Sequence, residues 1–94
     1  MVTLFGLTNC DTCRNARRAL DRAGVAVGFR DVRAEPLNQA ELRRLLAALG
    51  DALVNRRSTT WRALSESERS ADADVLLAAH PALMKRPVIE GIAA

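Results

Sequence analysis

The stretch VTLFGLTNCDTC, residues 2–13, decides the fold of this chain. Residues 2–5 form a short apolar run that Gly6 closes, which is typical of a buried strand. After a short loop, the spacing predicts a helix from Cys10 to Ala23, because its apolar residues recur at three- and four-residue steps. Gly24 then supplies a stop for this helix.

A second strand follows this helix. Val25, Val27 and Phe29 alternate with smaller or charged residues, which predicts a strand that ends near Val32. Strand, helix and strand within about 30 residues make a βαβ unit, and the two strands of such a unit are parallel.

The middle of the chain is predicted to be helical. Asn38 and Glu41 have the spacing of a capping box, and they precede an apolar stripe that ends at Gly50. The stripe consists of Leu42, Leu45, Leu46 and Leu49. Residues 55–60 are polar enough to form a loop, after which Trp61 is expected to return to the interior.

The last third of the chain repeats these signals. Ser65 and Glu68 form a second capping pattern, and Ala73 to Ala79 is predicted to be a helix that Pro81 ends. Val88-Ile89-Glu90 is a short apolar run after a proline, which favours a third strand.

Length and composition exclude several classes of protein. At 94 residues the chain is expected to form one domain, residues 1–94. No apolar run reaches the ~18 residues that span a bilayer, and the N-terminus lacks the features of a signal peptide. We therefore expect a cytoplasmic protein that does not contact a membrane.

The distribution of charge argues against direct nucleic-acid binding. The net charge is +3, from 14 basic and 11 acidic residues, and no basic run is longer than two residues. Aromatic residues make up 3% of the chain, too few for a platform on which bases stack. We interpret the arginines as a solvated surface.

Both cysteines lie in Cys10-Asp11-Thr12-Cys13, at the start of the first predicted helix. A thiolate at a helix N-terminus faces unpaired backbone N–H groups, so Cys10 is expected to be the more acidic sulfur. The helix dipole contributes about 0.3–1 kcal/mol, less than one pKa unit, and Asp11 opposes it. Cationic side chains are therefore also needed, and the candidates are Arg14, Arg57 and Arg86. Cys13, one turn further along, is placed to act as a resolving thiol.

Two structural interpretations of the cysteines are less favoured. A disulfide between Cys10 and Cys13 would close too small a loop to stabilise the chain much, and a persistent one is unexpected in the cytosol. Zinc needs four ligands, and His80 is the only histidine, so no metal site is predicted within one chain. Redox or nucleophilic use of Cys10 is favoured, and Cys-x-x-Cys on a βαβ unit suggests a thioredoxin-like α/β fold.

Three motifs strengthen this interpretation. They are FGLTNCDTCRNAR at residues 5–17, LVNRRSTTW at residues 53–61 and LMKRPVI at residues 83–89. Together they resemble the arsenate reductase (ArsC)/Spx/YffB family, and most closely its YffB-like branch. The resemblance implies a thioredoxin fold with a helical insertion at about Leu37 to Glu68.

The resemblance also implies roles for particular residues. Cys10 corresponds to the cysteine that attacks an oxyanion in the arsenate reductases, where glutathione and glutaredoxin complete the reduction. Arg86 corresponds to an anion-binding arginine, and Arg57, with Arg56 beside it, corresponds to a second. Pro87 is similar to the proline that such folds keep in the cis form opposite the cysteine.

This chain departs from the arsenate reductases in two ways. Cys13 supplies a second thiol, which the one-cysteine reductases lack and the Spx regulators possess. The family's third arginine, with a terminal strand and helix, would lie beyond Ala94, so the strand at Val88 to Glu90 is expected to present an exposed sheet edge.

Two hypotheses follow. The first is a thiol-dependent reductase in which Cys10 attacks a disulfide or an oxyanion such as arsenate, with glutathione or glutaredoxin as co-substrate and no bound cofactor. The alternative is a redox switch resembling Spx, in which a Cys10–Cys13 disulfide controls binding to RNA polymerase.

Overall fold

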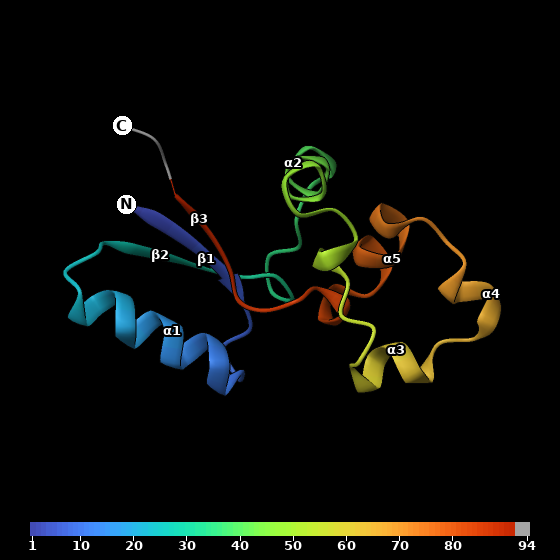
Figure 1. Ribbon diagram of the computed structural model, residues 1–94, viewed down its shortest axis with the longest axis horizontal. Helices are drawn as coiled ribbons and strands as arrows, with labels where there is room; N and C mark the ends of the chain where they lie inside the picture. The colour runs from blue at the N-terminus through green and yellow to red at the C-terminus, as the bar shows by residue number, and fades with distance from the viewer. Residues whose placement is uncertain (92–94) are drawn as a thin grey trace. The chain divides into compact units, whose positions relative to one another are not determined.

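The computed structural model describes residues 1–91 (Figure 1). The chain folds into two compact units. One unit joins Met1–Glu35 to the chain from Arg86 onward, and the other is Pro36–Lys85. Within the described residues, no helix has the length and apolar character needed to cross a membrane.

The first unit contains a three-stranded sheet and one helix. The strands are β1 (Val2–Gly6), β2 (Val27–Asp31) and β3 (Val88–Gly91), and the helix is α1 (Asp11–Arg22). β1 is central, parallel to β2 and antiparallel to β3. This arrangement confirms the predicted α/β class, the parallel βαβ unit and the third strand. Within residues 1–91, β3 pairs only with β1 and so forms a sheet edge.

One face of this sheet packs against α1 (Figure 1). Leu4 lies opposite Phe29 on one side and Ile89 on the other, so these three side chains share a face. The Arg17 guanidinium of α1 lies 5.5 Å from the centre of the Phe29 ring, which identifies that face as the one next to the helix. Leu4 is fully buried, whereas Ile89 on the edge strand is 47% exposed.

α1 begins and ends close to where its sequence predicts. Cys10 is its N-cap, with extended backbone angles, rather than its first helical residue. Ala23 is the C-cap, and Gly24 follows with a φ of 77°, a left-handed conformation that glycine adopts without steric cost.

The second unit is helical and contains both predicted capping boxes. Its elements are α2 (Gln39–Leu49), η1 (Gly50–Leu53), α3 (Thr59–Ala63), α4 (Glu66–Arg69), α5 (Ala73–Ala79) and η2 (Pro81–Leu83). Asn38 and Glu41 cap α2, and Ser65 and Glu68 cap α4. The expected insertion, about residues 37–68, lies within this unit, and α5 and η2 extend the helical region beyond it.

Two details of this unit differ from expectation. Leu49, the last residue of the predicted stripe, is 45% exposed, since the unit buries the earlier turns of α2. Trp61 is half-buried rather than part of the core. The guanidinium carbons of Arg56 and Arg69 lie 5.4 Å and 5.6 Å from the centre of the Trp61 ring. Cation–π contacts with these two arginines therefore cover part of the ring.

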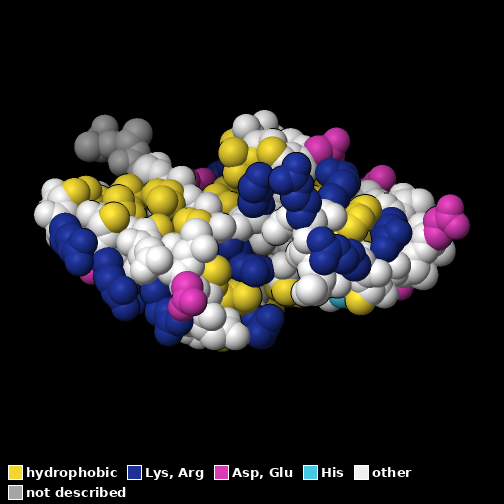
Figure 2. Space-filling model, turned by 60° about the horizontal axis from the view of Figure 1, so that its bottom comes forward, with side chains coloured by type: hydrophobic (Ala, Val, Ile, Leu, Met, Phe, Trp, Pro, Cys, Tyr) yellow, Lys and Arg dark blue, Asp and Glu magenta, His cyan; other side chains and the backbone are white. Residues whose placement is uncertain are grey.

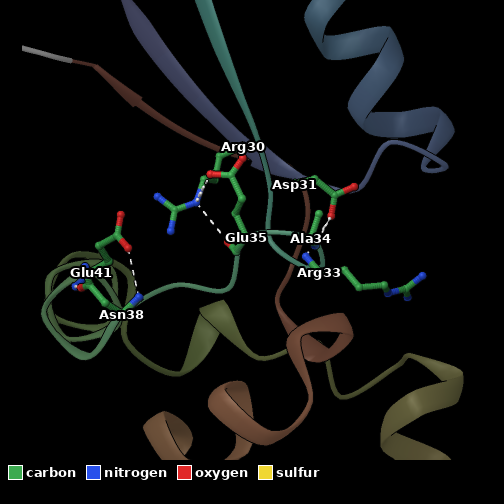
Figure 3. Close-up of polar contacts among 7 residues, drawn as sticks. All are labelled: Arg30, Asp31, Arg33, Ala34, Glu35, Asn38 and Glu41. Carbon is green, nitrogen blue, oxygen red and sulfur yellow. Dashed lines mark hydrogen bonds and ion pairs between the residues drawn. The ribbon is translucent and has the colours of Figure 1, made fainter.

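Asp31 ties the segment before Cys10 to the end of β2. Its carboxylate accepts hydrogen bonds from the backbone N–H groups of Arg33 and Ala34, at 2.8 and 3.0 Å (Figure 3). It also accepts one from the backbone N–H of Thr8, at 3.1 Å. The N–H groups of Ala34 and Thr8 make the largest contributions that lower the pKa of this carboxyl, which lies at about 2. Thr8 belongs to the loop between β1 and α1, so Asp31 helps to position the start of the helix.

We predict that Asp31→Asn destabilises the protein above about pH 4. The pKa of Asp31 in the folded chain is about 2, below the ordinary 3.8, so the ionised carboxylate stabilises the fold above the higher value. That stability is lost as the pH falls through about 2. The variant should lack this part of the pH dependence, as measured by urea unfolding between pH 2 and 7.

Asp21→Asn is the matched control, because Asp21 is an exposed carboxylate on α1 and its loss changes the net charge equally. Equal pH dependence of unfolding in the two variants would show that the Asp31 contacts contribute nothing beyond charge.

Candidate active site

Cys10 lies where β1 leads into α1. Its backbone N–H donates to the Leu7 carbonyl at 3.2 Å, and its own carbonyl accepts the first helical hydrogen bond, from Arg14, at 3.0 Å. The sulfur therefore lies at the N-terminus of a 12-residue helix. The Cys10 side chain is partly exposed, and both cysteines are free thiols.

Several groups stabilise a negative charge on the Cys10 sulfur. Partial burial raises the pKa of Cys10, but the backbone N–H and the thiol of Cys13, together with the Arg86 guanidinium, outweigh it. The result is a pKa below the ordinary value. The Cys10 side chain makes no capping hydrogen bond in the usual geometry, so the Cys13 N–H acts as a nearby donor rather than as a regular cap.

Cys13 has the opposite character. It is fully buried on the inner face of α1. Burial raises its pKa most, and the hydrogen bond to Cys10 and the negative charge there raise it further, while the Leu7 N–H and Arg86 only partly offset these effects. The structure thus gives one partly exposed thiol with a lowered pKa and one buried thiol with a raised pKa. The roles of nucleophile and resolving thiol stay predictions.

Of the three predicted arginines, Arg86 is the one that acts on the Cys10 sulfur. It precedes β3, and the Arg86–Pro87 peptide bond is cis, as the resemblance implies for Pro87. Arg14 forms an ion pair with Asp11, so the two charges nearest the helix N-terminus offset each other.

Arg57 belongs to the second compact unit, and its role toward Cys10 stays a prediction. Its backbone N–H donates to the Asn55 side chain at 3.0 Å. With Arg56 and Lys85 it lines an open depression of about 660 Å³. His80 ends α5 with its Nε2 3.5 Å from a Glu68 carboxylate oxygen, so it has a structural partner within the same unit.

Gly6 is a residue of the site whose role the sequence did not reveal. A Cβ atom at this position would lie 2.5 Å from the Cys13 sulfur, so only glycine leaves room for the buried thiol. The sequence marked Gly6 as the end of a strand, but a close approach to a side chain seven positions later has no local signal. Asp31 was missed for the same reason, although an aspartate after a strand is a common turn residue.

We predict that Gly6→Ala raises the apparent pKa of Cys10. Gly6 has no positive φ, so its backbone can accept alanine, and the new methyl group would displace the Cys13 sulfur. Cys13 would then donate less well to the Cys10 thiolate. The pH dependence of Cys10 alkylation by iodoacetamide measures the shift.

Gly91→Ala is the control, because a Cβ at Gly91 meets nothing within 4 Å. An unchanged alkylation profile in Gly6→Ala would contradict the role given to the Cys13 contact.

Two known proteins have sequences similar to nearly all of this chain. An uncharacterized protein of Haemophilus influenzae is 37% identical over 94 residues, which cover 95% of this chain and 82% of that protein. The global transcriptional regulator Spx of Bacillus subtilis is 32% identical over 95 residues, which cover 95% of this chain and 72% of Spx.

Solved structures show the same relationship. A YffB protein superposes with a TM-score of 0.86 at 36% identity, over 96% of this chain and 83% of that one. An arsenate reductase (ArsC) related protein from Brucella melitensis has a TM-score of 0.77 at 40% identity, over 96% of this chain and 79% of that one. These similarities confirm the expected thioredoxin-like fold.

The sequence model of the ArsC family matches residues 5–91, a range that includes the Cys-x-x-Cys segment, Arg86 and Pro87. With the relatives above, this match shows that the chain belongs to the ArsC family.

Proposed function

We propose that the protein is a cytoplasmic thiol-dependent reductase that uses Cys10 as its nucleophile. The observation that carries this proposal is the pairing of an accessible, acidified thiol with a buried thiol and an arginine. Thiol exchange is fastest when the attacking sulfur is already ionised near the ambient pH. The family relationship supports the same class of chemistry.

In the first step the Cys10 thiolate attacks one sulfur of a disulfide substrate. A new disulfide bond forms between Cys10 and that sulfur, the original bond breaks, and the electron pair leaves on the second sulfur as a thiolate. Arg86 lies beside the reacting sulfur and stabilises negative charge there. The partly exposed position of Cys10 leaves room for the partner sulfur.

In the second step Cys13 or glutathione resolves the mixed disulfide. Part of what raises the pKa of Cys13 is the negative charge of Cys10, and that charge disappears once Cys10 is bonded to the substrate. Cys13 then loses its proton more readily and attacks Cys10, which releases the substrate as a thiol. Glutathione or glutaredoxin would return the Cys10–Cys13 disulfide to the dithiol state.

The same site can in principle receive an oxyanion. Arg86 would bind its negative charge, and the Cys10 sulfur would bond to arsenic as one protonated oxygen leaves as water. Glutathione would then attack the Cys10 sulfur, the S–As bond would break, and its electron pair would stay on arsenic, which leaves as arsenite. Arg14 and Arg57 remain candidates for further contacts to such an anion.

We predict that Cys10, and not Cys13, forms a mixed disulfide when the reduced protein is mixed with oxidised glutathione. Intact-mass and peptide mass spectrometry would place the adduct, and Cys13→Ser should allow it to accumulate because the resolving thiol is absent. Parallel incubation with arsenate and reduced glutathione tests the oxyanion. A chain whose Cys10 forms no adduct under either condition would not be a reductase of this kind.

We also predict that Arg86→Ala raises the apparent pKa of Cys10, because the guanidinium stabilises the thiolate. Alkylation of Cys10 as a function of pH would measure this pKa. Arg22→Ala removes an equal charge at the far end of α1 and should leave the profile unchanged.

The second candidate function is a redox switch. The contact between the Cys10 and Cys13 thiols and the similarity to Spx favour it, and its partner would be RNA polymerase. Cys13→Ser separates the two functions, since a switch loses its oxidised state whereas a reductase resolved by glutathione keeps turning over. Failure of RNA polymerase to bind the oxidised protein would argue against the switch.

A further inference from the structure

We propose that α1 carries a docking surface for an acidic protein partner that exchanges thiols with Cys10. The surface is the arginine row Arg14, Arg18 and Arg22, which occupies one exposed side of the helix that begins at Cys10. Figure 2 shows a line of basic side chains along the part of the surface that α1 forms, with an acidic side chain near one end. This inference rests on the proposed exchange chemistry at Cys10.

The arginine row lies on a single face because its members are four residues apart. In a helix this spacing brings side chains one above another, and eight residues span about 12 Å. All three are exposed, whereas Cys13, Ala16 and Leu20 face the sheet to different extents.

The stability of the helix does not account for the row. Like charges four residues apart destabilise a helix by roughly 0.2–0.5 kcal/mol per pair, and the row contains two such pairs. A cation in the first turn also opposes the helix dipole, so only Arg22, in the last turn, is placed favourably.

Within residues 1–91, a carboxylate neutralises one member of the row and leaves the other two without an ion pair. Arg14 pairs with Asp11, and Arg18 donates a hydrogen bond to the Asn15 side chain at 3.5 Å. In this part of the chain neither Arg18 nor Arg22 forms an ion pair. Asp21, the other acid of α1, pairs with none of them in this part of the chain. Two guanidinium groups therefore remain available to a partner.

An acidic protein fits this surface better than a nucleic acid does. Duplex DNA carries one charge per ~1.7 Å and is bound by broader basic surfaces. This row has three arginines and an acid at its Cys10 end, and the neighbouring Arg17 lies over the Phe29 ring. Two or three carboxylates on a partner helix or loop match its length. The row leads directly to Cys10, so a partner held there can present its own sulfur.

The test measures thiol–disulfide exchange with two synthetic peptides of equal length. Each carries one cysteine linked to nitrothiobenzoate, flanked by glutamates in one peptide and by lysines in the other. Cys10 attacks the peptide sulfur, and nitrothiobenzoate leaves as a coloured thiolate, so its release gives the rate. We expect the acidic peptide to react roughly tenfold faster at low salt, with the difference vanishing at about 0.5 M salt.

The double variant Arg18→Ala/Arg22→Ala should abolish most of that preference. Its exchange with bis(2-hydroxyethyl) disulfide, which is small and neutral, should stay within about twofold of the original chain, because the variant leaves Arg86 in place. Arg43→Ala/Arg62→Ala is the matched control, since it removes two exposed arginines from helices of the other unit. The control should keep the preference for the acidic peptide.

The outcomes separate this inference from the proposed function. If Cys10 does not react even with the small disulfide, the reductase proposal fails. If it reacts normally but the two peptides react alike, or if both double variants lose the preference equally, the docking surface is overturned. Tighter, row-dependent binding of a single-stranded DNA oligonucleotide than of the acidic peptide would also overturn it.

Discussion

The candidate site depends on the pairing of β1 between two strands that run in different directions. β1 and β2 are parallel and are joined through α1. The chain leaves β1 at Gly6 and reaches Cys10, at the start of α1, four residues later. β3 is antiparallel to β1, and Val88 pairs with Phe5 near that same end. The residue two positions before Val88, Arg86, is thereby brought to the thiol. A third parallel strand would begin at the opposite end of the sheet and carry its preceding arginine away from Cys10.

The two sulfurs differ because they lie at different depths, although they are three residues apart. One helical turn moves Cys13 into the interior next to Gly6, where burial raises the pKa of its thiol. The Cys13 thiol donates a hydrogen bond to the Cys10 sulfur, and this bond lowers the pKa of Cys10. Burial that favours the thiol form of Cys13 therefore also favours the thiolate of Cys10. The lowered pKa of Cys10 and the raised pKa of Cys13 support each other. Both depend on the glycine at position 6, because only glycine leaves room for the Cys13 sulfur. The opposite directions of the two pKa shifts therefore arise from the packing, and not from the motif alone.

The features that the sequence predicts depend on short-range chemistry. The capping boxes at Asn38 and Ser65 and the helix Ala73–Ala79 are set by residues within a few positions, and all are present. The Cys-x-x-Cys segment likewise places the Cys10 residue at the N-cap position of α1. Contacts between distant residues had no such signal: Asp31 binds the Thr8 backbone 23 residues earlier. The half-buried state of Trp61 follows from Arg69, eight residues later, whose own hydrogen bond to the Trp61 carbonyl holds it near the ring.

Charge balance at the sulfur bears on which substrate suits the site. In disulfide exchange one negative charge moves from the attacking sulfur to the leaving sulfur, and a single guanidinium beside them compensates it throughout the reaction. An arsenate dianion approaching a thiolate instead gathers three negative charges, and repulsion in a partly desolvated site grows steeply with each. Within its compact unit, Arg86 is the cation that acts on Cys10, while Arg14 is already paired with Asp11. The charges of this unit therefore match the single charge that moves in the proposed disulfide exchange, whereas the proposed arsenate chemistry would need further cations.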